Sequence, residues 1–250
     1  MKQIFWVIHT SLDQTAADIC GFKEKSDNQH AIPAPLQQID QVVVFAADFG
    51  RGLSRVPEDF SIKTLGLDEA QLISYLDISC LAAAAEPGSE IFAFGHSTKT
   101  VFYRALRHRL DLYSLAGVKQ ICGRTFDQDL IARDADDSLS PTMAQTCAGL
   151  GVPLSEALAA LSDDDEDAVI KLGEIEALAG WLLCLLLENP NGHRLIEQSW
   201  ARLADWIEED PKRQHLLAFA HAADSYSKRA AETATADASQ DDDLPDGAPA

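Results

Sequence analysis

Residues 4–13 read I-F-W-V-I-H-T-S-L-D, an apolar run that turns polar at His9 and ends in small polar residues. The run predicts a buried strand over residues 1–9, because it is short and rich in β-branched and aromatic side chains. Ser11 and Asp13, which follow the run, are types that cap helices, so we expect a short helix over residues 14–22. This strand is the reference against which the rest of the chain is placed.

Further strand and helix patterns follow in an order typical of an α/β protein. β-branched or alternating runs predict strands over residues 39–47, 60–65 and 90–94, and apolar residues at helical spacing predict a helix over residues 67–85. From about residue 98 the pattern is helical, with candidate helices over residues 101–109, 141–150, 153–161, 168–188, 195–208 and 211–223. The order predicts an α/β fold, with a mixed β-sheet flanked by helices and a helix-rich C-terminal half.

The chain is strongly acidic. Its 250 residues include 40 acidic and 20 basic residues, for a formal net charge of −20. Proteins that bind nucleic acids usually present a basic surface, since contacts with phosphate supply most of the affinity. The composition therefore favours a protein partner over a nucleic acid. Apolar residues disappear near Arg229, which predicts one domain over residues 1–229 and an acidic disordered tail over residues 230–250.

The cysteines and the apolar runs indicate the compartment. Five cysteines occur without any C-x-x-C pair, namely Cys20, Cys80, Cys122, Cys147 and Cys184. We expect buried, reduced thiols, as in a cytoplasmic protein. The N-terminal apolar run is too short for a secretory signal, and the longest apolar run, residues 177–187, is shorter than the roughly 20 residues that a membrane span needs. The sequence thus predicts a cytoplasmic protein without membrane association.

One loop carries groups that could bind an anion. Residues 94–100 read F-G-H-S-T-K-T between a predicted strand and a predicted helix. Ser97, Thr98 and Lys99, together with Arg104, could hold an anion at the start of that helix. The loop lacks the G-x-x-x-x-G-K-[ST] frame of a phosphate-binding loop, and an ordinary capped helix start explains the same residues. No H-E-x-x-H or G-x-S-x-G motif occurs, so the residues by themselves define no catalytic site.

Residues 7–13, 103–106 and 173–175 read V-I-H-T-S-L-D, Y-R-A-L and G-E-I. In order and spacing these fragments resemble motifs of the 3′-5′ exonucleases related to the proofreading domain of B-family DNA polymerases. That family opens with D-I-E-T-x-x-D, has Y-R-A-L in a helix after its second motif, and has G-E-I in the helix of its third motif. The resemblance implies a ribonuclease-H-like sheet within residues 1–229.

The chain departs from that family at the positions that would carry catalysis. Such exonucleases bind two divalent metal ions with four carboxylates. The resemblance places these carboxylates at Val7, His9, Ser97 and Leu185, none of which is acidic. Shifts in the alignment would move the third to Thr100 and the fourth to Cys184 or Leu186. Hard cations need oxygen ligands, which valine and leucine lack. The resemblance therefore implies a pseudoenzyme, with no catalytic residues and no metal cofactor, that serves as a binding or structural module.

Two alternatives stay open. In the first, the chain is an active 3′-5′ exonuclease that depends on Mg²⁺ or Mn²⁺ and uses relocated acidic ligands, with Asp13, Asp48 and Asp111 as the candidates. In the second, the acidic surface and tail mimic a nucleic acid and occupy a basic partner. High negative charge also keeps a protein soluble, which explains the same composition without any partner.

Overall fold

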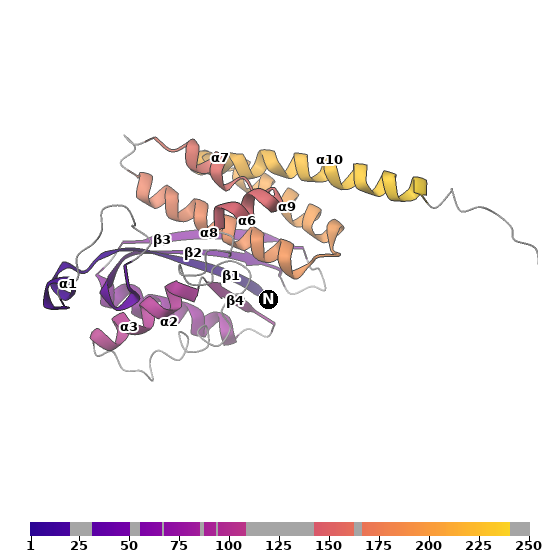
Figure 1. The fold of residues 1–250 in the computed structure, drawn as a ribbon. Helices are drawn as coiled ribbons and strands as arrows, with labels where there is room; N and C mark the ends of the chain where they lie inside the picture. Colours follow the sequence, from indigo (N-terminus) through magenta and orange to yellow (C-terminus); the bar gives the residue numbers. More distant parts are fainter. Residues whose placement is uncertain are drawn as a thin grey trace, which may run out of the picture.

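The computed structural model describes the chain at residues 1–20, 32–50, 56–66, 68–85, 88–93, 95–108, 143–162 and 167–240. Side chains are described over these ranges except at residues 34, 80–85, 95–99 and 229–240. The strands of the described ranges form one open sheet: β1 (Lys2–Leu12), β2 (Gln37–Asp48), β3 (Asp59–Leu65) and β4 (Glu90–Ala93). Helices cover both of its faces (Figure 1), which confirms the predicted α/β class.

The sheet is mixed, with the strand order β3-β2-β1-β4. β1 pairs antiparallel with β2 and parallel with β4, and β2 pairs antiparallel with β3. The register places His9 opposite Gln41 and Thr10 opposite Ile39, which leaves Asp40 as the extra residue of a bulge in β2. β1 is therefore an interior strand, flanked on both edges by other strands.

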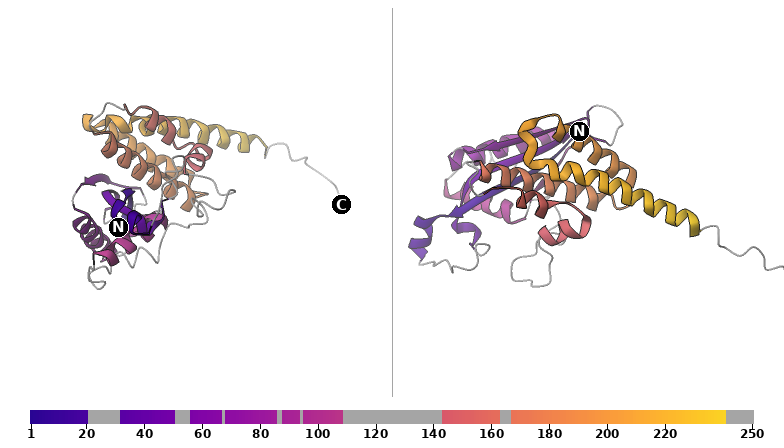
Figure 2. Two further views of the ribbon diagram at one scale, coloured as in Figure 1. Left: turned by 60° about the vertical axis from the view of Figure 1, so that its left-hand side comes forward. Right: turned by 90° about the horizontal axis from the view of Figure 1, so that it is seen from above.

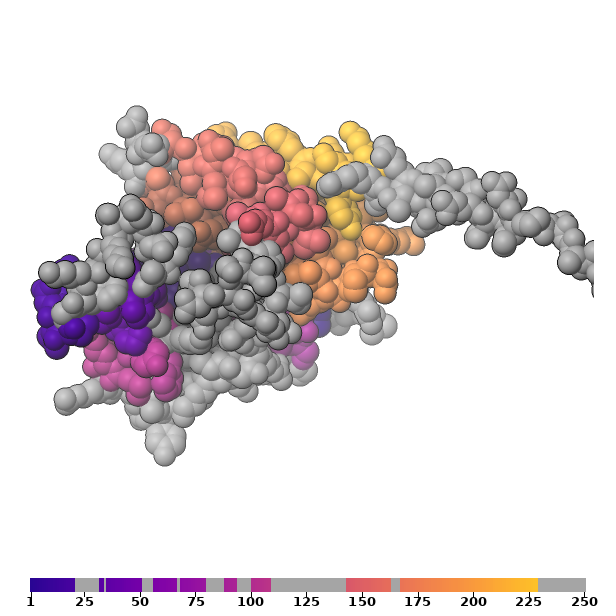
Figure 3. Space-filling view, viewed as in Figure 1, coloured from indigo at the N-terminus to yellow at the C-terminus, as the bar shows by residue number. Residues whose placement is uncertain are grey.

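The C-terminal helices cover one face of the sheet. α8 (Ala168–Glu188) lies on β1 and β2. The rest of this layer consists of α6 (Met143–Leu150), α7 (Leu154–Ala159), α9 (His193–Glu208), η3 (Pro211–Leu216) and α10 (Leu217–Gln240). Figure 2 shows the end of α10 projecting beyond this layer, and Figure 3 shows the layer, salmon to yellow, beside the indigo to magenta N-terminal part. Phe5 and Val7 point from β1 into the core beneath these helices.

Two glycines let α8 approach the sheet closely. A Cβ atom at Gly173 would lie 2.6 Å from Cγ2 of Val43, and one at Gly180 would overlap the ring of Phe5. Gly173 also borders His9, so α8 passes from the end of β1 toward its beginning and runs antiparallel to it. A larger side chain at either glycine would push the helix away from the strand.

The other face of the sheet is covered by α2 (Glu69–Ala85) and α3 (Gly95–Arg107). Trp6 and Ile8 alternate along β1 with the residues that face α8, and they point into this second core. Because β1 is apolar on both faces, it can be buried between two helical layers, as its continuous apolar run predicts.

The short helix α1 (Gln14–Cys20) follows β1 directly. The Asp13 carboxylate accepts a hydrogen bond from the Ala16 N–H at 2.9 Å, which is the contact expected of a helix N-cap. The 3₁₀ turn η2 (Ala34–Leu36) then leads into β2. The predicted turn from strand to helix is confirmed.

Three boundaries differ from those expected from the sequence. β1 continues to Leu12, beyond residue 9, because its polar end still pairs with the start of β2. α3 begins at Gly95 rather than at residue 101, so the residues expected to cap it lie inside its first turns. α10 is helical as far as Gln240, whereas the composition predicts disorder from residue 230. Residues 230–238 read A-A-E-T-A-T-A-D-A, and alanine is the strongest helix former.

Two expectations from composition can be compared with the described residues. None of the helices in the described ranges is long and apolar enough to span a membrane. Cys147 and Cys184 are buried, as expected, and burial raises the pKa of the Cys147 thiol to about 12. Cys20 is exposed, which corrects the expectation for this thiol, because it lies at the end of a short helix with one buried residue.

Candidate functional site

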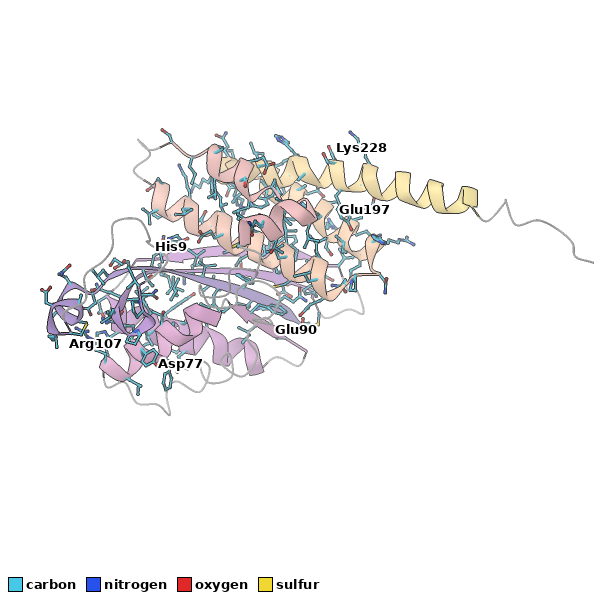
Figure 4. All side chains as sticks on the ribbon, in the orientation of Figure 1. His9, Asp77, Glu90, Arg107, Glu197 and Lys228 are labelled. Carbon is cyan, nitrogen blue, oxygen red and sulfur yellow. The ribbon has the colours of Figure 1, made fainter. Side chains whose placement is uncertain are left out.

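The end of β1 brings polar groups together beneath α8. His9 and Gln41 are cross-strand neighbours on the face of the sheet that α8 covers. Glu176 approaches from α8, with its Oε2 atom 3.2 Å from Nε2 of His9. Figure 4 shows His9 between the strands and the helical layer. These three residues, from three different elements, are called the His9 cluster below.

A second histidine–glutamate pair involves Glu174, which precedes Glu176 by two residues in α8. Oε2 of Glu174 lies 2.8 Å from Nε2 of His215 in η3, and Oε1 of Glu174 accepts a hydrogen bond from the Thr64 hydroxyl at 3.0 Å. Both carboxylate oxygens of Glu174 therefore have partners. The contacts join α8 to β3 and to η3, which is a structural role.

The positions that the resemblance assigns to metal ligands are spread along the sheet. Val7 is 3% exposed in the apolar core, opposite Val43, and is two residues from His9 on the same face. Leu185 is also 3% exposed in this core. It lies about 18 Å along the helix axis beyond Gly173, the residue that borders His9. The structure thus brings Val7 and His9 together and leaves Leu185 at the other end of the strand.

The shifted alignment positions are also in protein contacts. Thr100 is fully buried in α3, and its hydroxyl donates to Oε1 of Gln37 at 2.6 Å. Cys184 is buried in the core beneath α8, and burial raises its thiol pKa well above the ordinary value. Leu186 is partly buried against the same core. None of these three side chains offers an anionic oxygen.

The residues of the proposed anion site belong to α3. Ser97, Thr98 and Lys99 lie within its first turns, in the helical layer on the face opposite α8, and their side chains fall outside the described part. Arg104 lies in the same helix and is 3% exposed. Its guanidinium points inward, toward protein carboxylates.

Arg104 is the centre of a buried group of charges. Its Nη1 donates to Oδ2 of Asp13 at 2.7 Å, and its Nε and Nη2 donate to the two oxygens of Glu69, each at 2.6 Å. Arg107 contacts Oδ2 of Asp13 at 2.8 Å, and Nε2 of His108 contacts Oε2 of Glu69 at 2.6 Å. These five residues, called the Arg104 network below, join α1, α2 and α3.

Hydrogen bonds keep the carboxylates of the Arg104 network ionised in spite of their burial. Burial by itself would raise the pKa of both, but hydrogen bonds from the Ala16 N–H and from Arg104 hold the pKa of Asp13 below its ordinary range. Hydrogen bonds from Arg104 and from the Ile39 N–H do the same for the pKa of Glu69. Burial opposes the charge of Arg104, and the two carboxylates nevertheless raise its pKa. The donors of Arg104 are thus engaged within the protein.

The candidate relocated acids lie far apart. Asp13 follows the last residue of β1, whereas Asp48 pairs with Lys2 at its first residue. An 11-residue strand separates the two, which is roughly 30 Å. Asp48 also lies 3.9 Å from Nζ of Lys2 and accepts a hydrogen bond from the Gly50 N–H at 2.9 Å. Asp111 lies outside the described residues.

Two carboxylates meet at the end of the sheet away from His9. Glu188 is the last residue of α8, Glu90 is the first of β4, and Figure 4 shows Glu90 and His9 at opposite ends. Desolvation and the nearby Glu90 carboxylate raise the pKa of Glu188 to about 7. Glu90 also accepts a hydrogen bond from the Gln3 side chain at 2.8 Å. This end therefore holds a carboxyl group that titrates near neutrality.

Within the described ranges, no three or more histidine, cysteine, aspartate or glutamate side chains lie close enough together to hold a metal ion. No protein-family model, curated protein or solved structure matches the chain. The functional argument consequently rests on the fold and on its own polar groups.

The sequence missed Gln41, Glu176 and Glu69 as members of polar clusters. A usable signal for Glu176 was present, because Gly173 and Gly180 mark the side of an apolar helix that touches a strand. Glu176 follows Gly173 by three residues and so lies on nearly the same side. Glu69 gave no such signal, since its partners come from distant parts of the sequence.

Proposed function

We propose that the chain is a non-catalytic, ribonuclease-H-like module of the polymerase-proofreading exonuclease type, which acts by binding a protein or as a structural unit. One observation carries the proposal. Val7, which the resemblance places at a metal-binding aspartate, is packed in the apolar core beneath α8. Valine has no ligand atom, and the side chain of Val7 packs among apolar residues that supply no oxygen ligand.

The topology is compatible with this family. β1 to β3 form an antiparallel run, and β4 returns parallel to β1 after α2. Helices then cover both faces, which is the mixed, helix-flanked sheet that the resemblance implies. The sheet topology thus supports the proposal in two respects, namely the fold class and the interior position of β1 in the sheet.

His9 supports the loss of the hydrolytic metal pair. At this position the resemblance expects a glutamate, and Glu176 faces it from α8. Two carboxylates at this distance would repel each other unless a cation lay between them. A histidine and a glutamate can contact each other directly, and they attract when the imidazole is protonated. With histidine instead of glutamate at position 9, no hard cation is needed to bridge β1 and α8.

The charge supports a protein partner. A net charge of −20 opposes approach to a phosphate backbone. Arg104 and Arg107 belong to the densest basic segment of the sequence, and both are engaged with carboxylates of the protein. These two arginines are consequently poor candidates for a phosphate-binding surface.

The direct test uses the full chain with 5′-labelled DNA and RNA, single-stranded and duplex, in Mg²⁺ or Mn²⁺. We expect no metal-dependent shortening, and no saturable Mg²⁺ binding in calorimetry. Shortening that requires metal and disappears in Asp48→Asn or Asp111→Asn would contradict the proposal and support relocated ligands. Circular dichroism of each variant establishes that its fold is retained.

A further inference from the structure

The His9 cluster gathers three potential ligand atoms near one backbone position. A Cβ atom at Gly173 would lie 3.1 Å from Nε2 of His9 and 3.4 Å from Oε1 of Gln41. Oε2 of Glu176, one turn further along α8, lies 3.2 Å from the same nitrogen. The imidazole and the amide therefore both border Gly173, and the carboxylate borders the imidazole, where α8 crosses β1 and β2.

The contact between His9 and Glu176 is short but is not a hydrogen bond. Although the two atoms are 3.2 Å apart, Nε2 of His9 has no hydrogen-bond partner of acceptable geometry among the described residues. The carboxylate oxygen thus lies to one side of the N–H direction. Two ligands bound about 2.0–2.1 Å from a tetrahedral Zn²⁺ ion lie about 3.3–3.4 Å apart, with the ion on the ring-nitrogen axis and the second ligand beside it. The observed arrangement is close to that geometry.

Gln41 gives an independent indication of a ligand. The residue is 5% exposed, and its Oε1 atom has no hydrogen-bond partner among the described residues. A buried amide oxygen without a partner costs free energy, on the order of 1–3 kcal/mol. The bulge at Asp40 directly precedes Gln41 in β2, and bulges of this kind redirect neighbouring side chains.

We propose that His9, Gln41 and Glu176 bind one transition-metal ion of the Zn²⁺ class. Imidazole nitrogen with one carboxylate oxygen suits Zn²⁺, whereas Mg²⁺ requires about six oxygen ligands in octahedral geometry. Glu176 is 32% exposed, so water can reach the ion and fill a fourth position. The site would join β1, β2 and α8 and is distinct in chemistry from a carboxylate pair of metals.

Zinc binding to the 250-residue chain is measured by competition with a chromophoric chelator after alkylation of the accessible cysteines in the folded protein, which spares the buried Cys147 and Cys184. We expect one Zn²⁺ per chain, with the affinity reduced about tenfold or more in His9→Ala and in Glu176→Gln. Co²⁺ bound at the site should show visible d–d absorption without thiolate charge transfer. Gln41→Glu should bind Zn²⁺ more tightly than the natural chain, because it replaces a neutral ligand by an anionic one.

His215→Ala is the matched control, since His215 also contacts a glutamate of α8. Its zinc affinity should equal that of the natural chain. Absence of saturable binding, or equal affinity in His9→Ala and in the natural chain, would overturn the proposal. Misfolding cannot cause tighter Zn²⁺ binding by Gln41→Glu. A Zn²⁺ affinity of Gln41→Glu no higher than that of the natural chain would therefore also contradict the proposal. The outcome is independent of the nuclease test, which uses Mg²⁺ and Mn²⁺.

Discussion

Arg104 and Glu69 form a buried bidentate ion pair, in which Nε and Nη2 of the guanidinium each lie 2.6 Å from a different carboxylate oxygen. Both side chains are less than 10% exposed. A buried pair of this kind gives little net stability over apolar residues of the same size, but removal of one partner strands the other charge. The pair therefore fixes the packing of α2 against α3, and removal of either partner should lower the free energy of unfolding.

Glu69→Gln should lower the free energy of unfolding by about 3–5 kcal/mol, because it leaves the Arg104 guanidinium buried beside a neutral amide. Urea unfolding followed by circular dichroism measures the change. Arg107→Ala is the control within the same network, since its side chain is 40% exposed and contacts Asp13 from the surface. Arg107→Ala should lower the free energy of unfolding by about 1 kcal/mol or less. Equal losses in the two variants would contradict the assignment of the buried pair.

Acid should weaken the Arg104 network. The pKa values of Asp13 and Glu69 are held below their ordinary range in the folded state, so their contribution is fully present above about pH 4.5 and is lost as pH falls through the folded pKa values. The natural chain should therefore lose stability below this pH more steeply than the double variant Asp13→Asn/Glu69→Gln. Thermal unfolding between pH 3 and pH 7 measures both slopes, and parallel slopes would refute the prediction.

Gly173→Ala should destabilise the fold although alanine favours helices. The new methyl group would lie 2.6 Å from Cγ2 of Val43, and such overpacking costs about 1–3 kcal/mol. Gly149→Ala in α6 is the matched control, because nothing lies within 4 Å of its added Cβ atom. That variant should gain up to about 1 kcal/mol from helix propensity. Chemical unfolding of the two variants should therefore give changes of opposite sign.

Glu188→Gln should stabilise the protein in a pH-dependent way. The folded pKa of about 7 lies above that of the unfolded chain, so ionisation of Glu188 opposes folding progressively from about pH 4.5 upward and fully above pH 7. The residue keeps contact with solvent, which screens the effect to about 1 kcal/mol or less. The gain in melting temperature should appear at pH 8 and vanish near pH 4. A gain of equal size at both values would show that charge is not its cause.

Local patterns predicted the elements well, whereas packing decided which residues meet. α8 occupies Ala168–Glu188 as its apolar pattern predicts, and β2 extends the expected strand by a few residues. The helix register could not be read from the sequence. The resemblance placed a metal-binding position at Leu185, whereas Glu176 is the residue of α8 that faces His9. Which side of an apolar helix touches a strand depends on close approach, here at Gly173 and Gly180.

The position of β1 has a consequence for synthesis of the protein. During synthesis Phe5 and Val7 leave the ribosome well before Gly180, which lies in the helix that covers them. At ~5–20 residues per second, the ribosome reaches Gly180 on the order of ten seconds or more after it has added Val7. During that time the α8 face of the nascent sheet is bare, so a chaperone that shields apolar strands would act on this chain before α8 emerges.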